Sequence, residues 1–280
     1  YTGIPIASSY AAFISAVSIA MSLITRERFG LGQHIEVPLF DAMFPAMGSR
    51  VITLHDQPPS GPRGANVPWT RTYECRDGRW IQFHSGNLRF GQFLEETGAS
   101  SWDEPTTAAE QQQRIEELFK SRSANEWEDL IAAIGSEAAV CRTTLEWMSH
   151  PHAEESKMII QVDDPNFGKM TQPGINARLA LTPGAVQGPA PQTDAQRTDL
   201  LSDLGPVESA WGESDPNLKL SPVLQGIKVL DLCIVLAGPT CGRTLAEFGA
   251  DVIKIDSPDR QRVSFHNEIN RDKRSIVLNL

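Results

Sequence analysis

A glycine-containing turn followed by a strand that ends in an acid is the part of this chain best suited to binding a nucleotide. Gly238 stands in the turn after an apolar strand, and Asp256 closes the next strand. In a dinucleotide-binding βαβ unit, the backbone of such a turn approaches a pyrophosphate and the acid binds a ribose hydroxyl. The run Gly238-Pro-Thr-Cys-Gly242 lacks the G-x-G-x-x-G spacing, which disfavours an NAD or FAD site. An ordinary crossover of a parallel sheet is the simpler alternative.

Other residues with suggestive spacing also have simpler structural interpretations. His150 and His152 could bind a metal, but no carboxylate cluster stands near them in the sequence, so we expect polar surface and no metal site. Asp163 and Asp164 precede Pro165 and indicate a turn with solvated acids. The four cysteines lack the spacing of metal ligands, which favours reduced thiols in a cytoplasmic protein.

Charge and composition exclude one broad class of function. Lys and Arg total 25 against 35 Asp and Glu, a net charge of −10. A general nucleic-acid binder needs a basic surface, so we expect no nucleic-acid partner. With 40% hydrophobic residues in a chain of 280, a sizeable core can form.

An apolar stretch at residues 4–23 is long enough to suggest a membrane span. Pro5 and several serines interrupt this stretch, and small side chains recur on one helical face. These are Ser8, Ala11, Ser15, Ser18 and Ser22. Such a face is typical of a helix packed closely in a core, so we expect a buried helix over residues 9–28, stopped by Gly30, and no membrane contact.

Beyond this helix the pattern predicts a region of mixed strands and helices. Residues 33–37 alternate as a strand does, and Asp41 is placed to cap a second helix. A hairpin is expected to pair residues 70–76 with 79–85 across Asp77-Gly78. Amphipathic helices are predicted at 90–97, 107–120 and 124–134, with Ser123 or Asn125 capping the last, and core positions at Trp102, Trp127 and Trp147.

A change of composition divides the chain. Residues 182–222 are rich in Pro and Gly and predict a linker, interrupted by one short helix at about 195–204. Residues 223–280 predict a strand, a helix and a strand, with a further strand at 275–280. We therefore expect three parts, at residues 1–181, 182–222 and 223–280.

Three segments of the last part carry a specific resemblance. They are Val229-Leu-Asp-Leu…Leu236-Ala-Gly-Pro239, Phe248-Gly-Ala-Asp-Val-Ile-Lys-Ile-Asp256 and Asn270-Arg-Asp-Lys-Arg-Ser-Ile-Val-Leu278. In order and spacing they resemble the N-terminal signature of the family III CoA-transferases (the CaiB/BaiF family). Residues 1–181, with Gly3-Ile-Pro-Ile-Ala7 before a long helix, resemble the later portion of the same family. The chain is thus similar to a fragment spanning the join of a tandem, two-unit member.

The resemblance implies a fold, a reaction and a set of partners. The fold is α/β, a Rossmann-like parallel large domain with a smaller α+β domain, incomplete in this fragment. Members move CoA from an acyl-CoA donor to a carboxylic acid, so CoA and acyl-CoA are substrates and no cofactor is held permanently. Their units interlock, so a tandem member is expected to form a pseudo-dimer from one chain and could also form a homo-oligomer.

At the position of the nucleophile this chain departs from the family. Members carry an Asp directly after the segment equivalent to Gly3–Ala7, where this sequence has Ser8. A carboxylate that attacks a thioester forms a reactive mixed anhydride, whereas a serine ester would exchange poorly with an incoming carboxylate. The resemblance therefore implies a non-catalytic first unit. Ser8 is expected to cap its helix, with catalysis left to an Asp of a second unit.

The resemblance also places the CoA contacts. It puts Leu236 and Ala237 in a loop at the nucleotide or acyl site, Ser257 where many members have a basic residue, and Leu278 beside the adenine. Because Ser257 carries no charge, nearby cations such as Arg260 and Lys273 are expected to contribute to phosphate binding. A solvated cluster of basic residues is the alternative. Two other classes of function stay open, an NAD- or FAD-dependent oxidoreductase and a CoA-binding or assembly module without activity.

Overall fold

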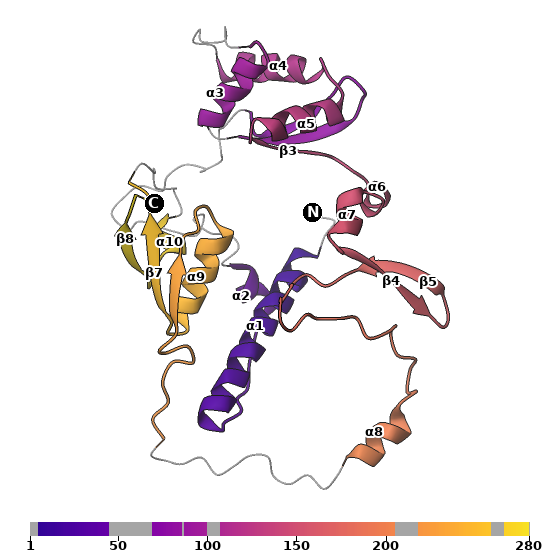
Figure 1. The fold of residues 1–280 in the computed structure, drawn as a ribbon, viewed down its shortest axis with the longest axis vertical. Coiled ribbons are helices and arrows are strands. Elements are labelled where there is room, and N and C mark those ends of the chain that lie inside the picture. Colours follow the sequence, from indigo (N-terminus) through magenta and orange to yellow (C-terminus); the bar gives the residue numbers. More distant parts are fainter. Residues whose placement is uncertain are drawn as a thin grey trace. The chain divides into compact units, whose positions relative to one another are not determined.

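The computed structural model describes residues 5–44, 69–85, 87–99, 107–204, 218–258 and 266–279. Contacts divide the chain into two compact units, residues 1–63 with 201–280 and residues 64–200 (Figure 1). The boundaries predicted at residues 181 and 222 divide the chain by its resemblance to the CoA-transferase units. The two compact units described here are defined by contacts, so they do not test those boundaries, which stay a prediction.

The first unit begins with a long helix whose small residues face its neighbours. α1 (Ile6–Phe29) ends at Gly30, which has the left-handed φ of 72° typical of a glycine cap. Ala11 is buried, and Ser15, Ser18 and Ser22 are partly buried on the same side. The next segment and the short helix α2 (Leu39–Met43) pack here, with Gln33 Nε2 donating to Ser22 Oγ at 2.9 Å. The predicted close packing is therefore seen at four positions of the small face, whereas Ser8 on the same face is exposed.

The remaining sides of α1 are apolar and largely exposed. Phe13 is 59% exposed, Ile19 53% and Leu23 57%. Within the described residues α1 is the one helix long and apolar enough to cross a membrane, by length and composition alone. A helix that is apolar on all sides is also typical of the centre of a large water-soluble domain. The prediction of a buried helix is wrong for this structure, in which Ala11 and Met21 are the buried residues of α1.

Two predictions near α1 are wrong. Residues 33–37 form no strand, because they lie along α1 and have no partner strand among the described residues. Asp41 does not cap α2; it lies inside the first turn, and Pro38 occupies the N-cap position.

A three-stranded parallel sheet forms the other part of the first unit. Its order is β6 (Lys228–Asp231), β7 (Asp251–Asp256) and β8 (Arg274–Val277), with α9 (Ala237–Glu247) crossing from β6 to β7 and α10 (His266–Ile269) preceding β8. On the α9 side, Val252 packs with Ala246, Ala250, Leu224 and Met21 of α1. The predicted βαβ crossover and third strand are confirmed, and the expected linker helix forms as α8 (Arg197–Asp203).

The second unit has an antiparallel sheet covered by helices. β1 (Arg71–Glu74), β2 (Trp80–His84) and β3 (Glu137–Val140) pair in that order. Against them pack α3 (Asn87–Glu96), α4 (Ala108–Phe119) and α5 (Ala124–Ala133), around a core in which Trp127, Phe93 and Phe119 are 0% exposed. Thr107 and Ser123 form capping boxes at α4 and α5. The hairpin, these helices and the burial of Trp127 were predicted correctly. Trp147, also predicted as a core position, is only partly buried, and Trp102 lies outside the described residues.

The unit continues through elements that the sequence did not reveal. They are β3, α6 (Thr144–Met148), α7 (Pro151–Glu155), β4 (Ile159–Asp164) and β5 (Gly168–Pro173). β4 and β5 form a hairpin whose turn contains Pro165, as expected. Asp164 is not solvated, however: it is 8% exposed and accepts the amides of Asn166 and Phe167 at 2.8 and 3.1 Å. Its role is to close the turn.

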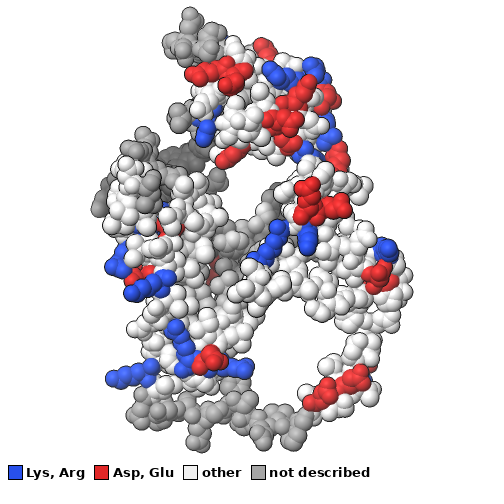
Figure 2. Space-filling view, viewed as in Figure 1, with Lys and Arg blue, Asp and Glu red and all other residues white. Residues whose placement is uncertain are grey.

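Acidic and basic side chains are mixed on the surface of the second unit (Figure 2). The acidic ones over α4 and α5 include Glu116, Glu117 and Asp129, while Arg142 pairs with Glu128 on α5. The Arg142 guanidinium lowers the pKa of Glu128 below its ordinary value, in spite of partial burial. No uniformly basic face is visible in this view, in keeping with the net charge of −10.

Candidate functional site

The carboxyl edge of the parallel sheet gathers most of the residues predicted to bind CoA. Because β6, β7 and β8 are parallel, their carboxyl ends share one edge. Leu236 and Ala237 follow β6, Ser257 follows β7, and Leu278 follows β8. Leu278 N donates to Asp256 O at 2.9 Å, which places Leu278 beside Ser257. This edge is where open α/β sheets bind ligands.

The turn between β6 and α9 is open to solvent at its apolar residues. Leu236 is 51% exposed and stands at the N-cap of α9 without a side-chain cap, and Ala237 begins the helix. A Cβ atom added to Gly238 would lie 2.2 Å from Cys233 Sγ. Glycine is needed here because the turn packs against this thiol. The glycine that suggested a nucleotide fingerprint therefore has a packing role.

Lys273, predicted to contact CoA, is buried beneath this turn. Its side chain is 1% exposed, and Nζ donates to Asp231 Oδ2 at 2.7 Å, to Pro239 O at 2.6 Å and to Asn270 Oδ1 at 2.9 Å. All three ammonium protons thus have protein acceptors. A direct contact with CoA would have to replace one of these bonds, so that role stays a prediction and an indirect role has better structural support.

Two further buried cations belong to the same region and were missed by sequence reasoning. Lys254 of β7 is 4% exposed; Nζ donates to Cys233 O at 2.5 Å and lies 3.2 Å from Asp256 Oδ1. Arg243 of α9 is also 4% exposed and pairs with Glu268. The sequence did contain a signal for the burial of Lys254, its position in the apolar run Val-Ile-Lys-Ile. Lys254 is two residues from the buried Val252, so the two side chains lie on the same face of the strand.

Ser8 lies elsewhere in the first unit. It is the third residue of α1, exposed, and α1 has no side-chain cap, since its N-cap residue is Pro5. The expectation that Ser8 caps the helix is therefore wrong. Among the described residues, the Leu236 carbonyl accepts the amide of Thr240, and Lys273 bonds to Asp231, Pro239 and Asn270, so neither is bonded to Ser8. Arg260 lies outside the described residues.

The two-histidine motif is part of a helix start. His150 is the N-cap of α7; its Nδ1 accepts the amide of His152 at 3.2 Å, and its ring stacks on Trp147. A search of the described residues finds no group of three or more His, Cys, Asp or Glu side chains able to hold a metal. Backbone capping and stacking account for both histidines.

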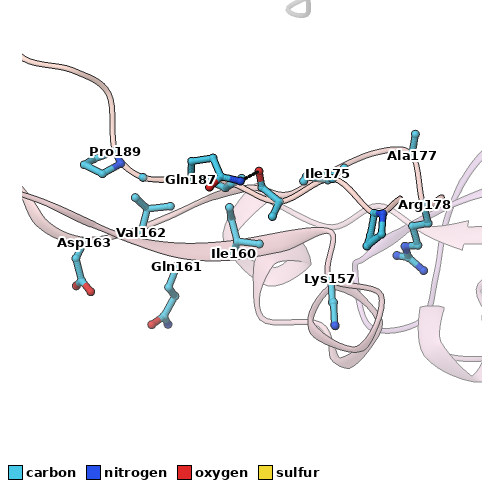
Figure 3. Close-up of a pocket in the computed structure, with 15 residues that line it drawn as sticks. Lys157, Ile160, Gln161, Val162, Asp163, Ile175, Ala177, Arg178, Gln187 and Pro189 are labelled. Carbon is cyan, nitrogen blue, oxygen red and sulfur yellow. Dashed lines mark hydrogen bonds between the residues drawn. The ribbon is translucent and has the colours of Figure 1, made fainter. Parts of the chain in front are cut away.

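A groove of about 700 Å³ lies in the second unit, between β4 and residues 175–189. Figure 3 shows Ile160 and Val162 turned toward the segment that contains Gln187, with Gln161 and Asp163 turned away. The floor of the groove is therefore apolar. It contains none of the residues predicted to bind CoA, and two cations, Lys157 and Arg178, stand among its lining residues.

Comparisons with known proteins identify the family. The chain matches CoA-transferase family III over residues 1–197 and 224–280. This chain belongs to CoA-transferase family III. It is similar to the CoA-transferase/lyase DddD of Marinomonas sp., with 26% identity over 91% of this chain and 38% of that protein. It is also similar to the succinyl-CoA–D-citramalate CoA-transferase of Chloroflexus aurantiacus, with 25% identity over 72% of this chain and 54% of that protein.

A solved structure supports the fold. A CaiB/BaiF family protein from Brucella suis superimposes with a TM-score of 0.57 and 21% identity, over 72% of this chain and 56% of that one. The α/β class and membership of the family named from the sequence are both confirmed, while the tandem arrangement stays a prediction. The family III chain studied here spans 38% and 54% of the lengths of the two curated relatives.

Proposed function

We propose that this chain is part of an acyl-CoA:carboxylate CoA-transferase, which moves CoA from an acyl-CoA donor to a carboxylic acid. The observation that supports this most is the family match, which covers residues 1–197 and 224–280. The two curated relatives reported above are both named as CoA-transferases. The exposed edge that carries Leu236, Ser257 and Leu278 supports the proposal, because open parallel sheets bind ligands at this edge.

The chain is proposed to span two units of a tandem enzyme. The family match falls in two segments separated by residues 198–223, close to the linker predicted from composition. A single alignment with DddD covers 91% of this chain, whereas the alignment with the citramalate enzyme covers 72%. A relative that holds both parts in the same order supports a tandem arrangement. Interlocking of the two units into a pseudo-dimer belongs to the same proposal.

The first family unit, residues 1–181, is proposed to be non-catalytic. A family nucleophile must form a mixed anhydride that an incoming acid or thiolate can open, and a serine ester is too stable for that role. Ser8 is exposed and has no histidine or lysine beside it in sequence to activate its hydroxyl. The catalytic Asp would then belong to the second family unit of the tandem, which begins near residue 223. Mass mapping of peptides after incubation with acyl-CoA tests this, because an acyl group on Ser8 would overturn the proposal.

A CoA-exchange assay tests the function as a whole. The intact protein is given acetyl-CoA or succinyl-CoA and a panel of carboxylic acids, and transfer of CoA to one of the acids is the expected result. An oxidoreductase would instead bind NADH, and an inactive CoA-binding module would bind acyl-CoA without exchange. Either outcome would contradict the proposed reaction. A cytoplasmic location, no nucleic-acid partner and no permanently bound cofactor complete the proposal.

A further inference from the structure

The buried ion pair between Lys273 and Asp231 joins three segments that surround the β6–α9 loop. Asp231 is the last residue of β6, Pro239 lies in the first turn of α9, and Asn270 begins the turn between α10 and β8. Lys273 bonds to all three, at 2.6–2.9 Å. One ammonium group therefore ties the beginning of the loop to its end.

The Asp231 side of the pair is equally enclosed. Its side chain is 3% exposed, and while Oδ2 binds Lys273, Oδ1 accepts the amide of Cys233 at 2.9 Å. Burial alone would raise the pKa of Asp231, but the bonds from Lys273 and Cys233 and the charge of Lys254 hold that pKa below its ordinary value. The carboxylate is thus ionised at neutral pH and charge-assisted in both of its bonds.

The loop is also held from its other face. The Cys233 carbonyl accepts Lys254 Nζ, while its amide donates to Asp231. Both backbone groups of Cys233 are therefore bound to buried charges. The loop residues that follow are exposed and lie between Cys233 and Pro239, both of which are hydrogen-bonded to buried side chains. They are Ile234, Val235 and Leu236. A loop fixed at both ends can present its backbone to a ligand at little entropic cost.

We propose that Lys273 and Asp231 are positioning residues, which fix the loop 232–238 for CoA binding without touching CoA themselves. The proposal rests on the proposed function, since it takes this edge as the CoA site. It replaces the expected direct contact of Lys273 with a phosphate. That contact would require the buried ammonium to give up at least one of its three short bonds inside the protein.

The test measures the dissociation constant of CoA for the intact protein at several salt concentrations. Lys273→Met and Asp231→Asn are compared with Lys228→Met, which makes the same change at an exposed lysine at the start of β6. Both pair variants should weaken CoA binding about tenfold, the scale of losing one or two positioned hydrogen bonds. Lys228→Met should bind as the wild type does. Because positioning involves no charge on the ligand, the salt dependence should stay unchanged.

The double variant Asp231→Leu/Lys273→Met keeps the test valid if a single variant fails to fold. Replacing a buried ion pair with apolar residues often preserves the fold, but here it still removes the donor to Pro239 O. A folded double variant with weakened binding supports the proposal, and one that binds CoA like the wild type overturns it. Weakening by Lys273→Met alone, with a shallower salt dependence, shows a direct phosphate contact and also overturns it. Absence of CoA binding by the wild type would instead refute the proposed function.

Discussion

Replacing Gly242 with alanine should destabilise the parallel-sheet unit, although the same change normally stabilises a helix. Gly242 lies inside α9 and is buried. In a helix interior, alanine is favoured over glycine by about 1 kcal/mol. At this site the new Cβ atom would lie 2.9 Å from Asp231 Oδ2 and 3.2 Å from Lys273 Nζ.

The net change in stability on Gly242→Ala depends on whether the side chains of Asp231 and Lys273 can move away from the added Cβ atom. Each is held by more than one hydrogen bond and is almost fully buried, so neither can yield without breaking the pair. Overpacking of this kind costs about 1–3 kcal/mol. With two buried charges as the obstacle we take the upper part of that range, which leaves a net loss of about 1–2 kcal/mol after the helix gain.

Denaturant unfolding followed by far-UV circular dichroism measures this difference. Gly91→Ala is the matched control, since Gly91 lies inside α3 and an added Cβ would meet no atom within 4 Å. The control should gain up to about 1 kcal/mol of stability. If Gly242→Ala were stabilised to the same degree as Gly91→Ala, the pair would be mobile, and the account of a rigid anchor would be refuted.

Three further predictions concern the second unit and the thiols. The Arg79 guanidinium and the Thr143 amide lower the pKa of Glu146 to about 2. The ionised carboxylate therefore stabilises the fold above its ordinary pKa of 4.5, and this stabilisation is lost as the pH falls from 4.5 toward 2. Glu146→Gln should reduce the change in unfolding free energy between pH 4.5 and pH 2, as measured by denaturation at each pH. Trp127 is 0% exposed and donates to Phe119 O at 2.8 Å. Trp127→Ala should therefore lower the free energy of unfolding by about 3–5 kcal/mol in a melting experiment, and Trp147→Ala, at a partly exposed position, by far less. Equal losses for the two variants would argue against the aromatic core. Burial raises the pKa of Cys75 to about 11, whereas Cys141, Cys233 and Cys241 are exposed. A thiol reagent at pH 8 should therefore label the three exposed cysteines quickly and Cys75 slowly. Equally fast labelling of all four cysteines would contradict this.

Local signals in the sequence predicted the elements that depend on local chemistry. The Asp77-Gly78 turn set the register of the hairpin, in which Arg71 pairs with Phe83. Thr107 and Ser123 marked the starts of α4 and α5, since each bonds to a glutamate three residues later. The alternation that suggested a strand at 33–37 failed because a strand also needs a partner, which the sequence of the segment does not supply.

The candidate site was predicted in part. The parallel strands could be placed from their apolar runs, and this brought Leu236, Ser257 and Leu278 to one edge. The burial of Lys273 and Asp231 could not be inferred, because the two residues are 42 positions apart and meet only after the sheet forms. Lysines usually lie on the protein surface, and the residues that flank Lys273 in the sequence do not indicate that it is buried.

Transfer of CoA by the intact protein, before and after a change at Ser8, tests the central claim most directly. Turnover from succinyl-CoA to the best acceptor acid is measured for the wild type and for Ser8→Ala, with folding checked by circular dichroism. If Ser8 has no chemical role, the two rates agree within about twofold, the usual scatter for an exposed position outside the chemistry. A loss of several orders of magnitude in a folded Ser8→Ala protein, as expected when a nucleophile is removed, would contradict it.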